Sequence, residues 1–137
     1  MGLMIKDAFD AEMASARSAY MNADYVVAFE RLKRAHILGQ RNLFRHWSTH
    51  WWMLRLGLRL KDKQEVVGQL VRLMAVVPGF MLGWIPVGNT GTSAVSALKP
   101  MPLPDDLAQI LGRVSVWRDV LLRGVLLGMA VLLFVLW

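Results

Sequence analysis

The stretch AHILGQRNLFRHWSTHWW, residues 35–52, contains all three histidines of the chain, His36, His46 and His50. His46 and His50 are four residues apart, so both side chains project from one face of a helix. His36 falls on the apolar face of the helix that we expect just before it. Since successive helices pack through their apolar faces, the pattern predicts that the three imidazoles share one interior.

The sequence around this stretch predicts an all-α fold. Apolar residues at helical spacing, interrupted by turn residues, predict four helices over residues 7–20, 25–38, 43–60 and 64–77. We expect Pro78 and Gly79 to end the fourth helix. Because the connecting turns are short, the four helices are expected to form two antiparallel hairpins.

A long segment rich in Pro and Gly follows the hairpins. Residues 80–104, FMLGWIPVGNTGTSAVSALKPMPLP, predict an ordered loop, and a short helix is expected over 105–111. The last helix is expected over 114–137. The predicted division of the chain is a helical-hairpin bundle over 1–79, a loop and short helix packed on the bundle over 80–112, and a C-terminal membrane-associated helix over 113–137.

The composition restricts the classes of protein to consider. Of the 137 residues, 55% are hydrophobic, which is high for one soluble domain and indicates a membrane or a partner that covers apolar surface. The formal net charge of +6 favours an anionic neighbour, either lipid headgroups or nucleic acid. The chain has no cysteine, which excludes disulfides and thiolate chemistry.

The C-terminal sequence VLLRGVLLGMAVLLFVLW, residues 120–137, has no polar residue from Gly124 onward. Arg118 and Arg123 lie on the N-terminal side of this apolar run, and Trp137 lies at its other end. By the positive-inside rule, this pattern predicts an anchor in a bacterial inner membrane with the N-terminal domain in the cytoplasm. The alternative is a buried core helix of a soluble protein.

Five motifs in combination resemble those of a family of small bacterial proteins known as a domain of unknown function: RAHILGQ (34–40), HxxxH (46–50), VGQLVRL (67–73), PVGNTG (86–91) and PMPLPDDL (100–107). The resemblance covers about residues 29–111, and it implies a helical fold with no established activity. The two hairpins also loosely resemble tetratricopeptide repeats, which suggests an adaptor.

The histidines are the candidate metal ligands. Two histidines one helical turn apart form half of a Cu or Zn site, and the third could complete it. Glu65 is expected as a carboxylate ligand or as a partner behind the ligands, and Met53 would suit Cu(I). The alternative is that the three are core histidines, hydrogen-bonded to Glu65, Gln40 or Gln69, which only fix the packing.

Two further features of the sequence each allow a functional and a structural interpretation. Glu65, Gln69 and Arg72 form a polar line on the fourth predicted helix, which points either to the histidines or to solvent. Asn89 and Thr90 lie in the Gly-rich turn of the long loop, which either contacts a partner or is a plain turn.

Basic residues and tryptophans are interleaved over residues 31–63. Given the apolar C-terminus, this combination of basic residues and tryptophans favours binding to anionic lipid at a cytoplasmic membrane face over binding to nucleic acid. The sequence shows no arrangement typical of a catalytic site, so an enzyme is not the favoured class.

The sequence therefore favours a membrane-anchored accessory protein with a histidine cluster that binds Cu or Zn. Such a protein would act as a subunit or metal-handling partner of a larger membrane protein complex. The alternative is a non-catalytic helical-repeat adaptor with packing histidines, and a nucleic-acid-binding protein is the least favoured class.

Overall fold

The computed structural model describes residues 2–112 and 116–136, which form helices and loops without a β-strand. Within these ranges six helices follow in chain order: α1 (Gly2–Met21), α2 (Tyr25–Gly39), α3 (Leu43–Leu60), α4 (Lys63–Leu82), α5 (Asp105–Leu111) and α6 (Val116–Leu136). The all-α prediction is confirmed.

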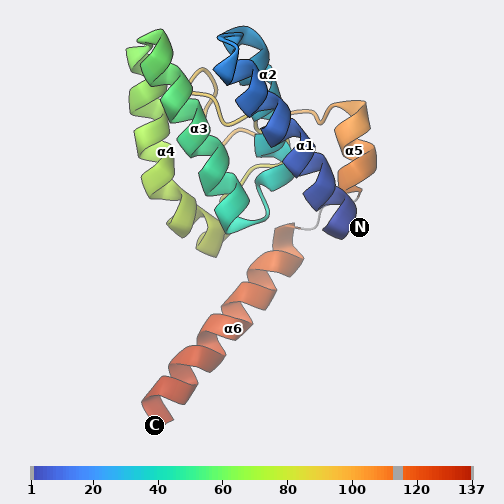
Figure 1. Ribbon diagram of the computed structural model, residues 1–137. Helices are drawn as coiled ribbons and strands as arrows, with labels where there is room; N and C mark the ends of the chain where they lie inside the picture. Colours follow the sequence, from blue (N-terminus) through green and yellow to red (C-terminus); the bar gives the residue numbers. More distant parts are fainter. Residues whose placement is uncertain (1, 113–115, 137) are drawn as a thin grey trace.

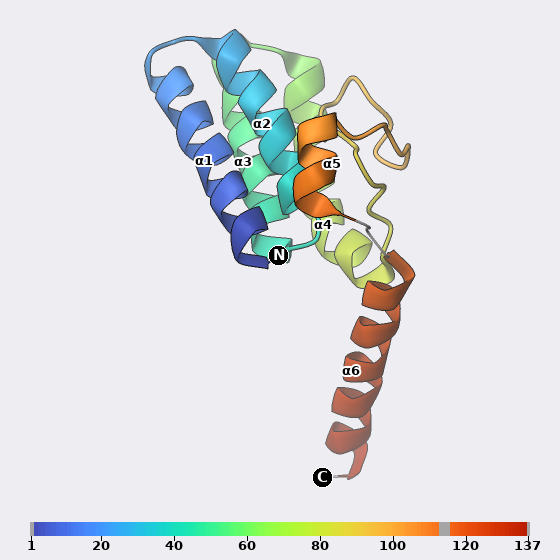
Figure 2. The ribbon, with the colours of Figure 1, turned by 90° about the vertical axis from the view of Figure 1, so that its right-hand side faces the viewer.

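The first four helices form two antiparallel hairpins that pack through α2 and α3 (Figure 1). The short helix α5 lies against α1 and α2 (Figure 2). Large apolar side chains from these helices form one core: Phe9, Met13, Leu32, Leu38, Met53, Leu56, Leu107 and Leu111. The predicted hairpin arrangement agrees with these contacts.

Three helices begin at a side chain that caps them. Asp24, Asn42 and Asp62 each accept a hydrogen bond from the backbone N–H three residues further on, before α2, α3 and α4 respectively. Such caps satisfy backbone donors that a helix start otherwise leaves unpaired. The cap at Asn42 thereby fixes where α3 begins. The start of the helix in turn determines the direction in which His46 and His50 project.

The helix α4 extends further than the sequence predicts, because it passes through Pro78 and ends at Leu82. Proline removes one backbone donor, and here that loss falls on an exposed turn of the helix. The helix ends instead at Gly83, whose φ of +71° is left-handed and whose N–H donates to the carbonyl of Gly79. The predicted end at Val77 is therefore wrong, and the loop begins at Gly83.

The loop over 83–104 runs along the bundle between α4 and α5 (Figure 2). Its own contacts give it a defined structure: the Asn89 side chain donates to the carbonyls of Ser96 and Lys99, each at 2.8 Å. The Met101 N–H also donates to the Val87 carbonyl. The loop is thus ordered, and it covers the histidine-bearing faces of α2 and α3.

The helix α6 projects away from the bundle and carries the C-terminus at its far end (Figures 1 and 2). Its described apolar side chains from Leu121 onward are exposed. Within the described residues, however, the one helix long and apolar enough to cross a membrane is α4, while the apolar part of α6, Gly124–Leu136, is shorter. Trp137 and the side chains of Arg118 and Arg123 lie outside what the structure describes.

Candidate metal centre

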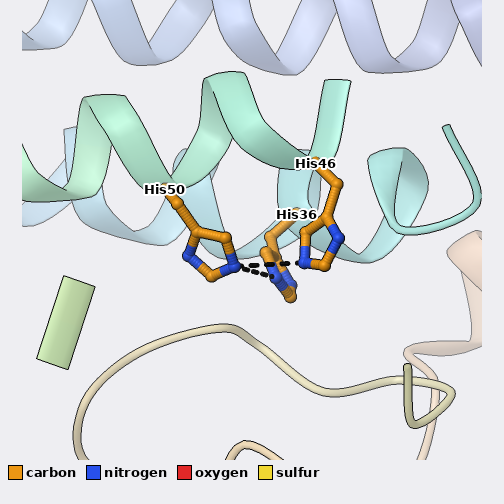
Figure 3. Close-up of side chains that lie close together, drawn as sticks. All are labelled: His36, His46 and His50. Carbon is orange, nitrogen blue, oxygen red and sulfur yellow. Dashed lines mark hydrogen bonds between the residues drawn. The ribbon is translucent and has the colours of Figure 1, made fainter. Parts of the chain in front are cut away.

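The three histidines converge in the interior, as the spacing in the sequence predicts. His36 comes from α2, His46 and His50 come from α3, and all three side chains are buried. Figure 3 shows the rings turned toward one another. One potential ligand atom from each ring lies within 4.8 Å of the other two, so the cluster could hold a metal ion.

The Nε2 atoms form the centre of the cluster. The Nε2 atom of His50 lies 3.2 Å from Nε2 of His36 and 3.0 Å from Nε2 of His46. A tetrahedral ion bound to nitrogens at about 2.0–2.1 Å holds them roughly 3.3 Å apart. The observed spacing therefore fits three nitrogen ligands of one ion after small side-chain shifts.

The loop determines the tautomer of His36. Its Nδ1 lies 2.8 Å from the carbonyl oxygen of Asn89, which can only accept a hydrogen bond. The same oxygen accepts from the Gln40 side chain at 2.9 Å. The Nδ1 atom of His36 therefore carries the proton, and its Nε2 atom presents a lone pair to the other rings.

The helix α4 determines the tautomer of His50 in the same way. Its Nδ1 lies 2.7 Å from Oε1 of Gln69. The amide orientation of Gln69 follows from its nitrogen, which donates to Glu65 at 2.6 Å and to the Gly91 carbonyl at 2.9 Å. The Nδ1 atom of His50 therefore donates to Gln69, and its Nε2 atom also presents a lone pair.

These assignments place two lone pairs face to face. In their neutral forms, Nε2 of His36 and Nε2 of His50 are both acceptors at 3.2 Å, so neither can donate to the other. Two buried acceptors in contact repel each other unless a donor or a cation lies between them, and Nε2 of His46, 3.0 Å from Nε2 of His50, is the one ring nitrogen of the cluster that could donate. The arrangement is that of ligands oriented for a metal ion, with a carbonyl oxygen behind the ring of His36 and an amide oxygen behind that of His50.

His46 completes the cluster with an unusual feature. Its Nδ1 atom is buried and has no hydrogen-bond partner among the described residues. Its backbone carbonyl accepts from the hydroxyl of Thr49, so the backbone at this position is fixed. Whichever nitrogen carries the proton, packing alone leaves this ring with one unsatisfied buried polar atom.

The electrostatics keep all three rings neutral. Burial lowers the pKa of His46 to about 4 and that of His50 to about 3. Burial also lowers the pKa of His36 well below its ordinary value, and the neighbouring His50 and His46 add to this effect. Neutral imidazole is the form that binds metal, so the site is ready to bind at neutral pH without losing protons.

The polar line of α4 points inward over its first two positions. Glu65 and Gln69 are buried, and both oxygens of Glu65 are occupied, one by Gln69 and the other by the N–H and hydroxyl of Ser93. Glu65 thus lies behind Gln69 and holds the amide that orients His50. These contacts favour the supporting role for Glu65 over the role of a direct ligand.

Arg72 lies beside the site rather than in it. Its guanidinium donates to the carbonyls of Thr92 and Val95 at 2.8 and 2.6 Å and so ties α4 to the loop. Burial lowers the pKa of this guanidinium. Met53 is buried in the core, and its sulfur accepts from Gln69 at 3.6 Å.

Several residues of the site were not singled out from the sequence. The chief one is Gly91, whose φ is +77° and whose Cα lies against the His36 ring: a Cβ there would lie 2.5–2.7 Å from three atoms of the imidazole. Ser93 is another. The motif PVGNTG marked this turn, but nothing in the sequence shows which helix the turn approaches.

Asn89 is buried and holds the loop together, while Thr90 is partly exposed beside it.

Fold and site together define an all-α bundle protein with a buried cluster of three neutral histidines. The chain belongs to the family described as protein of unknown function DUF3703, whose family model matches residues 3–111. No curated protein and no solved structure matches the chain. The matched range includes the bundle, the loop and α5, and therefore the whole histidine cluster.

Proposed function

We propose that this chain is a membrane-associated accessory protein that binds one Zn or Cu ion through His36, His46 and His50. The observation that carries the proposal is the contact between two Nε2 lone pairs at 3.2 Å, each fixed by a hydrogen bond at the opposite nitrogen. Imidazole nitrogen suits both metals, and three protein ligands leave one coordination position open.

The alternative of packing histidines explains the cluster less well. Histidines retained for packing are expected to satisfy both ring nitrogens, because an unpaired buried polar atom costs about 1–3 kcal/mol. Here Nδ1 of His46 has no partner among the described residues, and the Nε2 acceptors of His36 and His50 face each other, with Nε2 of His46 as the one ring nitrogen that could donate to them. A bound cation relieves the repulsion between the acceptors.

The membrane part of the proposal is supported by the outer surface of the protein. The side of α4 that faces away from the bundle is apolar and exposed over its whole length: Val67, Leu70, Val71, Met74, Val77, Met81 and Leu82. Together with the exposed apolar side chains of α6, this forms an extended exposed apolar surface, which is typical of contact with a membrane or a partner. We place the bundle on the cytoplasmic face, where the exposed Arg55 and Arg59 of α3 meet anionic lipid.

Metal analysis of the purified full chain tests the site. We expect about one Zn or Cu per chain after growth in supplemented medium, and a loss of at least tenfold in metal content in His46→Ala and in His50→Ala. Phe44→Ala, on an exposed position of the same helix, is the matched control and should keep its metal. A wild-type chain that folds but holds no Zn or Cu would support the adaptor interpretation instead.

Flotation with anionic phospholipid vesicles tests the membrane part. The full chain should float with the vesicles, and a chain that ends at Gly112 should float much less but bind metal equally well. Equal recovery of both chains in the unbound fraction would refute membrane association through α6.

A further inference from the structure

A cavity of about 170 Å³ lies next to the histidine cluster, between the second half of α4 and the loop. The three histidines form part of its wall, and Val76, Trp84 and Leu98 lie among the apolar residues that form much of the rest. The cavity therefore opens onto the histidine cluster, and a further ligand of a metal ion held by the three histidines could enter through it.

The charges around this cavity have one sign. Arg72 is the one charged side chain in its wall, counting the residues that the structure describes, and no carboxylate lines it. The nearest buried carboxylate, Glu65, is occupied by Gln69 and Ser93. A divalent ion bound to three neutral imidazoles would add two positive charges, and the single carboxylate of Glu65, which also interacts with Arg72, offsets only part of the positive charge.

A buried excess of positive charge is costly, and an anion at the open coordination position removes part of it. The apolar walls would favour an anion whose remaining part is also apolar. The volume gives room for a ligand of about six to ten non-hydrogen atoms.

We propose that the cavity binds a small monocarboxylate with an apolar body, whose carboxylate coordinates the metal while its hydrocarbon part lies against Val76 and Trp84. The inference rests on the proposed metal site. Arg72 contributes its charge from the wall of the cavity, although its hydrogen bonds to the loop carbonyls keep it in place.

The full chain loaded with Co²⁺ in place of Zn provides the test, because the visible absorption of tetrahedral Co²⁺ responds to its fourth ligand. We expect butyrate and benzoate to shift these bands with dissociation constants at least tenfold lower than that of formate. Butylamine and butanol, which have an apolar body but no negative charge, should leave the bands unchanged.

Two variants that fill the cavity locate the binding. Val76→Phe, at a buried position in the wall, should weaken butyrate binding at least tenfold and leave the Co²⁺ bands in place; Val77→Phe, on the exposed side of the same helix, is the matched control. Ala97→Leu tests the same cavity from the loop if Val76→Phe does not fold.

The outcomes separate the two proposals. If Co²⁺ does not bind, both the metal site and the carboxylate site are refuted. If Co²⁺ binds with tetrahedral bands but no carboxylate shifts them, the metal site stands and the carboxylate site is refuted. Equal affinity for formate and butyrate, or unchanged binding in both cavity-filling variants, also overturns the inference.

Discussion

At the scale of single residues, the histidine cluster depends on the groups behind it. His36 and His50 each donate from Nδ1 to an oxygen that other hydrogen bonds hold in place. Because these oxygens fix the tautomers, they also fix the direction of the Nε2 lone pairs. Gln69 is central, since its amide joins His50 to Glu65 and to the Gly91 carbonyl.

Replacement of this glutamine tests the supporting role. Gln69→Met keeps nearly the same side-chain length but removes the acceptor for His50, so we expect the affinity for Zn²⁺ to fall about 10- to 100-fold. Competition with a chromophoric chelator measures this affinity. Leu70→Met, at the exposed neighbouring position, is the matched control, and an affinity for Gln69→Met equal to that of this control would refute the role.

At the scale of elements, the sequence predicted helices better than it predicted what they face. The bounds of α3 agree with the prediction because Asn42 and the apolar periodicity mark them locally. The predicted end of α4 was wrong, since Pro78 costs only one hydrogen bond, on an exposed turn, and the helix continues to Leu82. Gly83 carries the local signal for the helix end, but it lies in the Gly- and Pro-rich segment that the sequence pattern assigns to the loop.

The orientation of α4 illustrates the limit of sequence patterns. Glu65 and Gln69 face inward and the apolar residues on the other side face outward, the reverse of a soluble amphipathic helix. Periodicity defines two faces but does not say which one is buried. The histidine cluster itself was predictable, because His46 and His50 share a helical face, whereas the approach of Gly91 to His36 depends on how a long loop folds back.

Two glycines of the loop give a matched pair of variants. Both Gly88 and Gly91 have positive φ, +75° and +77°, so alanine strains the backbone at either position, with an expected loss of about 1–3 kcal/mol in stability. A Cβ at Gly91 meets the His36 ring, whereas a Cβ at Gly88 meets the Met101 carbonyl. We therefore expect Gly91→Ala to weaken metal binding by at least tenfold and clearly more than Gly88→Ala, which acts on His36 only through the neighbouring Asn89 carbonyl.

Urea unfolding and chelator competition measure the two effects of these variants separately. Similar losses of metal affinity in Gly88→Ala and Gly91→Ala would mean that the loop acts through its general stability. In that case the close contact between Gly91 and the His36 ring would not position the ligand.

At the scale of the whole molecule, the buried histidines connect the site to the stability of the fold. The pKa values of His46 and His50, about 4 and 3, are below the ordinary value of 6.5, and that of His36 is lowered as well. Below pH 6.5 the unfolded chain therefore binds more protons than the folded chain. The contribution of the buried neutral histidines to the free energy of unfolding is fully present above this pH and is lost as the pH falls toward 4.

The metal-free chain should therefore be sensitive to mild acid. Each buried histidine costs up to about 1.4 kcal/mol of unfolding free energy per pH unit in this window, so the three together cost up to about 4 kcal/mol per unit. Urea unfolding at pH 7.5, 6.5 and 5.5 measures the loss in a range above the titration of ordinary carboxylates. An unfolding free energy that stays constant from pH 7.5 to 5.5 would contradict the burial of neutral rings.

X-ray absorption at the metal edge of the full chain loaded with Zn²⁺ tests the central claim most directly. The account predicts three nitrogen neighbours at about 2.0–2.1 Å with the outer-shell pattern of imidazole, and one oxygen ligand at the fourth position. A spectrum with one imidazole or none, or with sulfur from Met53 in the first shell, would contradict the assignment of His36, His46 and His50 as the ligands.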